Sequence, residues 1–297
     1  MTTIKHSTVL RVCSLLVVLT ATMLVAKESQ PSSCILETNG IDTLWQIVES
    51  YIAQGIKAEE ISIAFDMDET LVTTYLEVNG KRIDFPQSRF FDFLKATVKT
   101  LNTKAGIAAP LDAIFARNNA IVTHLLQENI LKTRPMEAHT LQMLDALQAK
   151  KVNVFILTAR PFFAAERTEK LLGELNITLQ PSFLKTPETM IDTQIGCAFK
   201  NGVLYAQKGK IDKGDAMAKF FAAHDYKPRV LIAIDDRIEY LDGIERALQS
   251  WTDVSYKGIW YRRAEAWGID DALAHQTLEA HLGDKWWAVA RSGTLQQ

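Results

Sequence analysis

The sequence predicts an α/β protein whose strands form a parallel sheet. Two apolar runs, Ile61–Phe65 and Val230–Ile234, have the length and the continuous hydrophobicity of strands that are buried on both faces. Segments with the spacing of amphipathic helices lie between them. Each run is followed directly by a pair of aspartates, which places acids at the carboxyl end of a strand. Ligands bind at that edge of open α/β sheets, so the same observations predict a site.

The first acidic pair is Asp66 and Asp68, and Thr70 follows it. Two carboxylates this close together repel each other unless a cation lies between them. A small hydroxyl beside them can bind an anionic oxygen. This stretch therefore predicts a site for a divalent metal and a phosphate. The structural alternative is a helix cap, because Asp and Thr are common at helix N-termini.

The second acidic pair is Asp235 and Asp236, directly after Val230–Ile234. Two such pairs after two buried strands are much less expected by chance than one, and this favours the functional interpretation. A third apolar run, Val152–Leu157, ends at Thr158, whose hydroxyl is a further candidate. Taken alone, Thr158 is better explained as a cap for the helix that follows.

Three lysines, Lys208, Lys210 and Lys213, precede a predicted helix over Gly214–Ala223. A lysine cluster is usually a solvated surface. One of these side chains could instead direct a cation into the site, and the pattern leaves open which one.

The other elements follow from local patterns. Asn-Gly between two short alternating runs is a strong hairpin signal, and a hairpin after the first acids would overhang them. The chain from Asp66 to the next core strand is far longer than one αβ unit requires, which predicts an inserted helical cap at about 89–132. The remaining expectations, in chain order, are a loose lead-in over 27–40, a helix over Ile41–Ile56, hairpins over Thr73–Phe85 and Ile195–Ala206, a core helix opened by Pro135, a strand over Val254–Tyr261, a helix over Asp270–Leu282, and a tail packed on the core through Trp286 and Trp287.

The first 26 residues have the pattern of a signal peptide. Lys5 and Arg11 precede the apolar segment Val12–Ala26, and no acid occurs up to Ala26. The apolar segment is short for a membrane-spanning helix. We therefore expect cleavage after Ala26, a domain over 27–297, no stable membrane insertion after cleavage, and a periplasmic or secreted protein. The alternative is an uncleaved N-terminal membrane anchor.

Composition narrows the function classes. The 33 basic and 35 acidic residues give a net charge of -2 without a basic run, so the sequence does not indicate nucleic-acid binding. The histidines and cysteines do not cluster, which argues against zinc. Cys34 and Cys197 remain after cleavage and could pair in an oxidising compartment. The sequence does not predict an oligomeric state.

In chain order, the motifs resemble those of the haloacid dehalogenase (HAD) superfamily over roughly Ile41 to Tyr261. The layout, with its signal peptide, is similar to secreted HAD-like phosphatases, including a family of unassigned function. The resemblance implies a Rossmann-like parallel sheet flanked by helices, with a β-hairpin flap and an inserted helical cap. The residues that carry it are Asp66-x-Asp68-x-Thr70, Thr158, a lysine, and Asp235-Asp236.

The resemblance also implies catalytic roles. Asp66 would be the nucleophile that forms an aspartyl-phosphate, and Asp68 the general acid and then the base. Thr70 and Thr158 would bind the substrate's phosphoryl oxygens. Lys213, which stands at the start of the predicted helix, would neutralise charge on the nucleophile and the phosphoryl group, with Lys208 and Lys210 as alternatives.

The cofactor implied by the resemblance is Mg²⁺. Its ligands would be the Asp66 carboxylate, the Asp68 backbone carbonyl and Asp236, with Asp235 acting through water. Superfamily members often carry one more acid a few residues further on. Here Glu239 and Asp242 are the candidates, and the spacing does not decide between them.

The predicted function is a Mg²⁺-dependent phosphohydrolase that acts on small phosphomonoesters. The dehalogenase branch does not use the second acid, so the presence of Asp68 argues against it. A phosphotransferase or mutase would share the same residues. The alternative from another class is a secreted binding or effector protein on a HAD scaffold, with little or no turnover.

Overall fold

The computed structural model describes residues 34–104, 121–122, 124–179, 181–184, 188–192 and 194–283. The chain divides into two units, Met1–Cys34 and Ile35–Gln297, and the fold below is that of the second. The predicted signal peptide, most of the second predicted cap helix and the two C-terminal tryptophans lie outside the described residues. None of the helices in the described ranges is long and apolar enough to cross a membrane.

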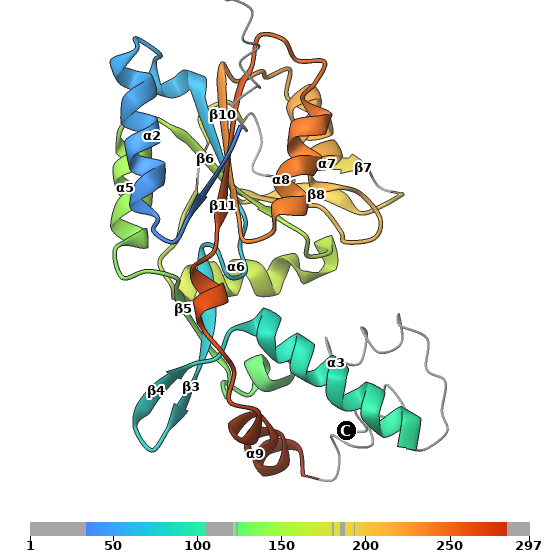
Figure 1. The fold of residues 1–297 in the computed structure, drawn as a ribbon. Coiled ribbons are helices and arrows are strands. Elements are labelled where there is room, and N and C mark those ends of the chain that lie inside the picture. Colours follow the sequence, from blue (N-terminus) through green and yellow to red (C-terminus); the bar gives the residue numbers. More distant parts are fainter. Residues whose placement is uncertain are drawn as a thin grey trace, which may run out of the picture. The chain divides into compact units, whose positions relative to one another are not determined.

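A mostly parallel sheet forms the centre of the second unit (Figure 1). Within the described residues its strand order is β1-β11-β10-β2-β6-β9-β8-β7, and neighbours are parallel from β1 to β9, whereas β8 is antiparallel to both β9 and β7. This confirms the predicted α/β class. The strands are β1 Ile35–Thr38, β2 Ile61–Phe65, β6 Asn153–Thr158, β7 Glu188–Asp192, β8 Cys197–Lys200, β9 Val203–Tyr205, β10 Val230–Asp235 and β11 Ser255–Tyr261.

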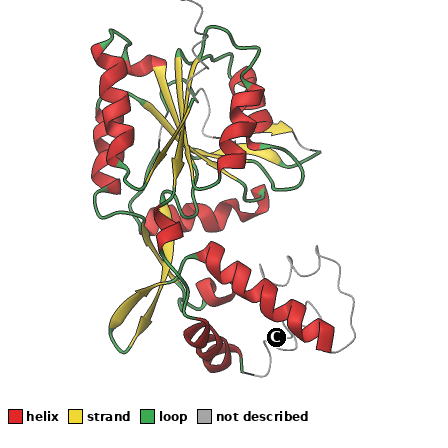
Figure 2. Cartoon of the chain, in the orientation of Figure 1, coloured by secondary structure: helices red, strands yellow, loops and turns green. Residues whose placement is uncertain are grey.

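Helices cover both faces of this sheet. Figures 1 and 2 show α2 and α5 on one face, and α7 and α8 on the other. Side chains alternate accordingly: in β2, Ile63 and Phe65 pack in the α2–α5 layer, and Ala64 packs in the α7–α8 layer. The helices are α2 Asp42–Ala53, α5 Thr140–Ala149, α6 Ala165–Glu174, α7 Lys213–Ala223 and α8 Ile238–Ala247.

A second, smaller sheet follows the first acidic pair. Its strands β3 (Val72–Val78), β4 (Lys81–Asp84) and β5 (Lys132–Pro135) are antiparallel in the order β4-β3-β5. The predicted hairpin is present, with Asn79 and Gly80 at its turn in the left-handed region. The structure thus places an antiparallel hairpin directly after the strand-end acids.

The helix α3 (Gln87–Lys104) continues from this small sheet. Its Phe90 and Leu94 pack in a hydrophobic cluster of their own with Ala274 and Leu278 of α9 (Asp271–Leu282), separate from both layers of the main sheet. We call the described residues of 72–135 together with α9 the hairpin module. That the last helix packs here was not evident from the sequence.

Two predictions were wrong. The lead-in contains β1, which pairs in parallel with β11 at the sheet edge, so main-chain bonds order a segment that has little side-chain signal. Pro135 does not open the next helix: it ends β5 opposite Val72, and α5 begins at Thr140. Proline has the φ of a first helical residue, but its missing N–H is equally harmless at a strand end.

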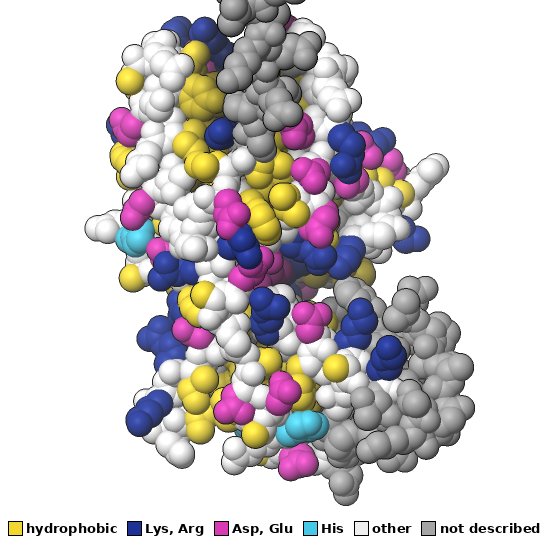
Figure 3. Space-filling view, viewed as in Figure 1, with side chains coloured by type: hydrophobic (Ala, Val, Ile, Leu, Met, Phe, Trp, Pro, Cys, Tyr) yellow, Lys and Arg dark blue, Asp and Glu magenta, His cyan; other side chains and the backbone are white. Residues whose placement is uncertain are grey.

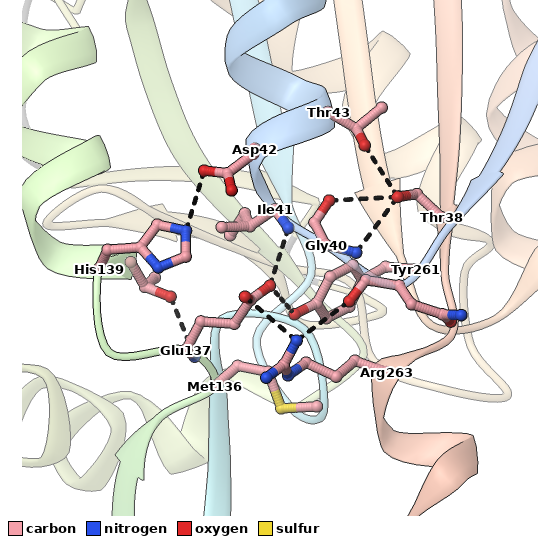
Figure 4. Close-up of polar contacts among 12 residues, drawn as sticks. Thr38, Gly40, Ile41, Asp42, Thr43, Met136, Glu137, His139, Tyr261 and Arg263 are labelled. Carbon is pink, nitrogen blue, oxygen red and sulfur yellow. Dashed lines mark hydrogen bonds and ion pairs between the residues drawn. The ribbon is translucent and has the colours of Figure 1, made fainter.

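A buried glutamate follows β5 and joins three segments (Figure 4). The Oε1 atom of Glu137 accepts hydrogen bonds from the backbone N–H of Ile41, at the start of α2, and from the Tyr261 hydroxyl, at 2.8 and 2.6 Å. Its Oε2 atom lies 3.2 Å from Nη1 of Arg263. We call these four residues the Glu137 cluster. Both carboxylate oxygens of this buried acid are satisfied.

Candidate functional site

The two predicted acidic pairs meet because their strands are neighbours. Strands β2 and β10 pair in parallel, and the N–H of Asp66 extends the ladder by donating to the carbonyl of Ile234 at 2.8 Å. Both strands therefore end at the same edge of the sheet, with Asp66 and Asp235 side by side. Both side chains are buried, and Asp236 is partly buried.

One carboxylate oxygen from each of Asp66, Asp235 and Asp236 can be chosen so that the three atoms lie within 4.8 Å of one another. We call these three residues the aspartate cluster. Several carboxylate oxygens converging on one point are the donor set that hard divalent cations prefer. The cluster is thus compatible with a divalent metal.

One buried cation serves two of these acids. The Nζ atom of Lys213, which is 1% exposed, lies 2.5 Å from Asp66 and 2.7 Å from Asp235. It also lies 4.5 Å above the centre of the Tyr240 ring. The structure therefore brings Lys213 into the site, whereas Lys208 and Lys210 are exposed.

Local sequence explains how Lys213 reaches the acids. Asp212 caps α7 by accepting from the N–H of Gly214 at 2.8 Å, so the helix begins at Lys213. A Cβ at Gly214 would lie 2.3 Å from the carbonyl oxygen of Gly243 in α8. Only glycine permits this close approach, which places the first turn of α7 over the end of the sheet.

The charges of the cluster do not balance. Burial raises the pKa of Asp66 to about 7, although Lys213 opposes this shift. Burial, followed by repulsion from Asp66 and Asp235, raises the pKa of Asp236 to about 9. The pKa of Asp235 is raised by burial as well, and Lys213 again opposes the shift. Three acids share one lysine, so a further positive charge is needed before all three can ionise together.

Asp68 is not part of the cluster, because its carboxylate binds Arg160 instead. Arg160 donates from Nε to Oδ2 at 2.9 Å and from Nη2 to Oδ1 at 2.7 Å, a bidentate pair. Arg160 also donates to Thr168 at 3.2 Å. Sequence reasoning missed this arginine, although it stands only two residues after Thr158 at the same strand end.

The two predicted hydroxyls are both buried. Thr70 is 0% exposed, and its Oγ1 atom has no hydrogen-bond partner among the described residues. Thr158 accepts from the N–H of Arg160 at 3.2 Å. A buried hydroxyl without a partner is costly, so the Thr70 environment suits a bound oxygen.

Glu69 is a second residue that the sequence analysis missed. It lies between Asp68 and Thr70, is buried, and adopts φ 67°. Burial raises its pKa to about 8. The other two acids considered, Glu239 and Asp242, lie on α8 outside the aspartate cluster.

Fold and site together define an α/β protein with a mostly parallel sheet and a buried acidic cluster at the carboxyl ends of two central strands. The chain belongs to the family described as a protein of unknown function (DUF2608), whose model matches residues 42–280. No curated protein matches the chain.

Among solved structures, the chain is similar to a hydrolase described as a haloacid dehalogenase-like family protein from Streptococcus pneumoniae. The identity is 14%, the TM-score is 0.35, and the match covers 67% of this chain and 94% of that one. A likeness at that level carries no argument about activity.

Proposed function

We propose that the protein is a Mg²⁺-dependent phosphohydrolase that cleaves small phosphomonoesters through an aspartyl-phosphate on Asp66. The observation that carries the proposal is the aspartate cluster with the buried Lys213 between two of its members. A buried nucleophile candidate, an oxygen-ligand set and a fixed cation at one sheet edge suit phosphoryl transfer, in which charge must be neutralised as it is redistributed.

The residues fit a divalent cation because their charge is in excess. Asp66 and Asp236 would bind it through their carboxylates, the Asp68 backbone through its carbonyl, and Asp235 through a water. When bound, Mg²⁺ neutralises the cluster and polarises a phosphoryl oxygen. An ion there would also restore the ionised form of Asp66, which burial disfavours.

The chemistry then follows from the carboxylates of the chain. An oxygen of Asp66 attacks phosphorus as the ester bond breaks, and the leaving oxygen takes a proton from Asp68. Asp68 next removes a proton from water, which attacks the aspartyl-phosphate. Free phosphate leaves and Asp66 is restored. Lys213, Thr70 and Thr158 hold the phosphoryl oxygens during both steps.

Arg160 acts on this cycle through Asp68. In the structure it holds both oxygens of the Asp68 carboxylate. One of these oxygens must be released before Asp68 can donate or accept a proton. We therefore assign Arg160 as a positioning residue that fixes Asp68 beside the site.

The hairpin module is proposed as the cap that covers the substrate and excludes water. It follows the nucleophile strand directly and has its own hydrophobic cluster.

We also propose that residues 1–26 are removed on export. Intact mass of the exported protein should then begin at Lys27, and a mature chain that retains Met1 would contradict this.

The test of the proposed function is phosphate release from a panel of alkyl and aryl phosphates during a Mg²⁺ titration, with and without EDTA. We expect Mg²⁺-dependent release that EDTA abolishes. If the protein binds Mg²⁺ but releases phosphate from no member of the panel, a binding or effector protein without turnover becomes the better assignment.

A further inference from the structure

We propose that Glu69 is a positioning residue that couples the start of α3 to the loop carrying Asp68, an inference that rests on the proposed phosphohydrolase function. Glu69 follows Asp68 directly in the chain. Its Oε1 atom accepts a hydrogen bond of 2.7 Å from the backbone N–H of Gln87, the first residue of α3. The bond thus links the proposed catalytic loop to the hairpin module.

The local geometry makes this contact costly to keep. Glu69 is 2% exposed, and its Oε2 atom has no hydrogen-bond partner within the described part of the chain. Its backbone lies in the left-handed region, which few residues other than Gly and Asn adopt. The turn is closed by the N–H of Glu69, which donates to the carbonyl of Val72 at 2.8 Å. Glycine would adopt this backbone conformation without strain. The Glu69 side chain adds the bond to the Gln87 N–H at the cost of that strain.

The contact is also well placed to transmit movement. Asp68, Glu69 and Arg160, which follow strands of the main sheet, lie around the same spot as Gln87 and Leu126 of the hairpin module. The hydrophobic cluster of the module is separate from the layers of the main sheet. Figure 3 shows acidic and basic side chains gathered where the two meet on the face in view. A polar boundary between the main sheet and the hairpin module permits relative movement of the two. Glu69 bridges this boundary, and it is the residue next to Asp68, the proposed proton donor.

The expected consequence concerns proton transfer. If α3 shifts, the Glu69–Gln87 bond either moves the Asp68 loop with it or breaks. Without the bond, Asp66 and the aspartate cluster stay in place while Asp68 is less well oriented. The defect should therefore be largest for substrates whose leaving oxygen needs a proton.

The bond can be removed from either end. Glu69→Ala deletes the acceptor, and Gln87→Pro deletes the donor at the first helical position, where proline is tolerated. Glu69→Gln keeps an acceptor oxygen, so it should preserve both the bond to the Gln87 N–H and the wild-type activity. If Glu69→Ala folds poorly, Glu69→Gly removes the carboxylate and relieves the backbone. The matched control is Glu77→Ala, which removes an exposed acid that pairs with Lys132 within the module.

The measurements are kcat/KM for an alkyl phosphate and for nitrophenyl phosphate, with hydrogen exchange of the α3 amides on the same proteins. We expect Glu69→Ala and Gln87→Pro each to lower kcat/KM for the alkyl phosphate by about 10-fold and for the aryl phosphate by less than about twofold. The double variant should lose no more than either single variant. Exchange should accelerate at the first turn of α3, and Glu69→Gln and Glu77→Ala should resemble the wild type.

Equal losses on both substrates, or additive losses in the double variant, would overturn the coupling. A wild type that releases no phosphate overturns the proposed function instead. Hydrogen exchange then tests the coupling between Glu69 and α3 without any need for activity. Unchanged exchange at α3 in Glu69→Ala would contradict the coupling, whether or not the protein turns over substrate.

Discussion

Among the described residues, the Glu137 cluster and the aspartate cluster both hold buried acids, and the difference between them supports the place that we propose for the chemistry. In the Glu137 cluster, one carboxylate accepts from a backbone N–H and a tyrosine hydroxyl and lies beside an arginine. In the aspartate cluster, three carboxylates lie together and Lys213 pairs with only two of them, Asp66 and Asp235. The first cluster is satisfied by the chain itself, whereas the second is not.

The contrast shows why a count of buried acids does not identify a site. A buried carboxylate with all its partners rigidifies the segments that it joins, here the start of α2 and the end of β11. A group of carboxylates in excess of their cations raises its own pKa values and favours a metal or a proton.

The largest expected effect is the loss of turnover in Asp66→Asn. The amide cannot attack phosphorus, so no phosphoenzyme should form and phosphate release should fall to the uncatalysed rate. Glu137→Gln, the matching acid-to-amide change in the other cluster, should retain turnover. The check is phosphate release and trapping of a base-labile phosphoenzyme. An active Asp66→Asn variant would contradict the nucleophile assignment.

The next effect is smaller and depends on the substrate. Asp68→Asn leaves the nucleophile in place and should lower kcat/KM by about 10²–10⁴-fold for an alkyl phosphate. The effect on kcat/KM should be smaller for nitrophenyl phosphate, whose leaving group needs no proton. Arg160→Lys keeps the charge but cannot form the bidentate pair, and should cost about 10-fold with the same substrate preference. Equal losses of kcat/KM on both substrates would exclude Asp68 as the proton donor to the leaving oxygen.

The sequence predicted the elements with strong local signals and missed those that depend on tertiary pairing. The buried runs Ile61–Phe65 and Val230–Ile234 became neighbouring central strands, and the Asn-Gly turns formed hairpins. Strand β1 has little side-chain signal of its own, because its order comes from pairing with β11. Pro135 fits a helix start and a strand end equally well, and only the partner strand β3 decides between them.

The site shows the same limit. Asp66, Asp235 and Asp236 follow buried strands, so their convergence could be predicted from parallel pairing. Arg160 and Glu69 could not be assigned in this way. Their partners, Asp68 and the Gln87 N–H, depend on how a loop and the hairpin module pack against the sheet. Sequence patterns identify which residues end a strand, but not which of their neighbours bind each other.

The third prediction concerns stability and has opposite signs in the two clusters. Glu137→Gln removes the charge that faces Arg263, and should lower the free energy of unfolding by about 1–2 kcal/mol. In the metal-free protein at pH 7, the raised pKa of Asp236 means that folding must protonate this acid. Asp236→Asn removes that cost, and should raise the free energy of unfolding by about 1 kcal/mol. Urea unfolding in EDTA measures both. Destabilisation of the metal-free protein by Asp236→Asn would show that the cluster is already satisfied without a cation.

The smallest effect is the pH dependence of stability that we expect from the aspartate cluster. Its acids have raised pKa values in the folded chain, about 7 for Asp66 and about 9 for Asp236, against 3.8 for the ordinary group. At a pH between the ordinary pKa of 3.8 and these raised values, the folded state binds more protons than the unfolded state. The free energy of unfolding therefore falls as pH rises through this range. The pKa of Lys213 is raised above 10.5, so it titrates outside this window.

In EDTA, Tm should therefore decrease from pH 6 to pH 9, and the double variant Asp66→Asn/Asp236→Asn should reduce this slope to the part that Glu69 contributes, because burial raises the pKa of Glu69 to about 8. Glu77→Gln is the control, because the pKa of this exposed acid is lowered and its titration lies well below the window. Mg²⁺ binds the ionised acids, so the increase in Tm that it causes should be larger at pH 9 than at pH 6. If the double variant keeps the wild-type slope, the excess charge of the cluster is not what opposes folding, and the contrast with the Glu137 cluster fails.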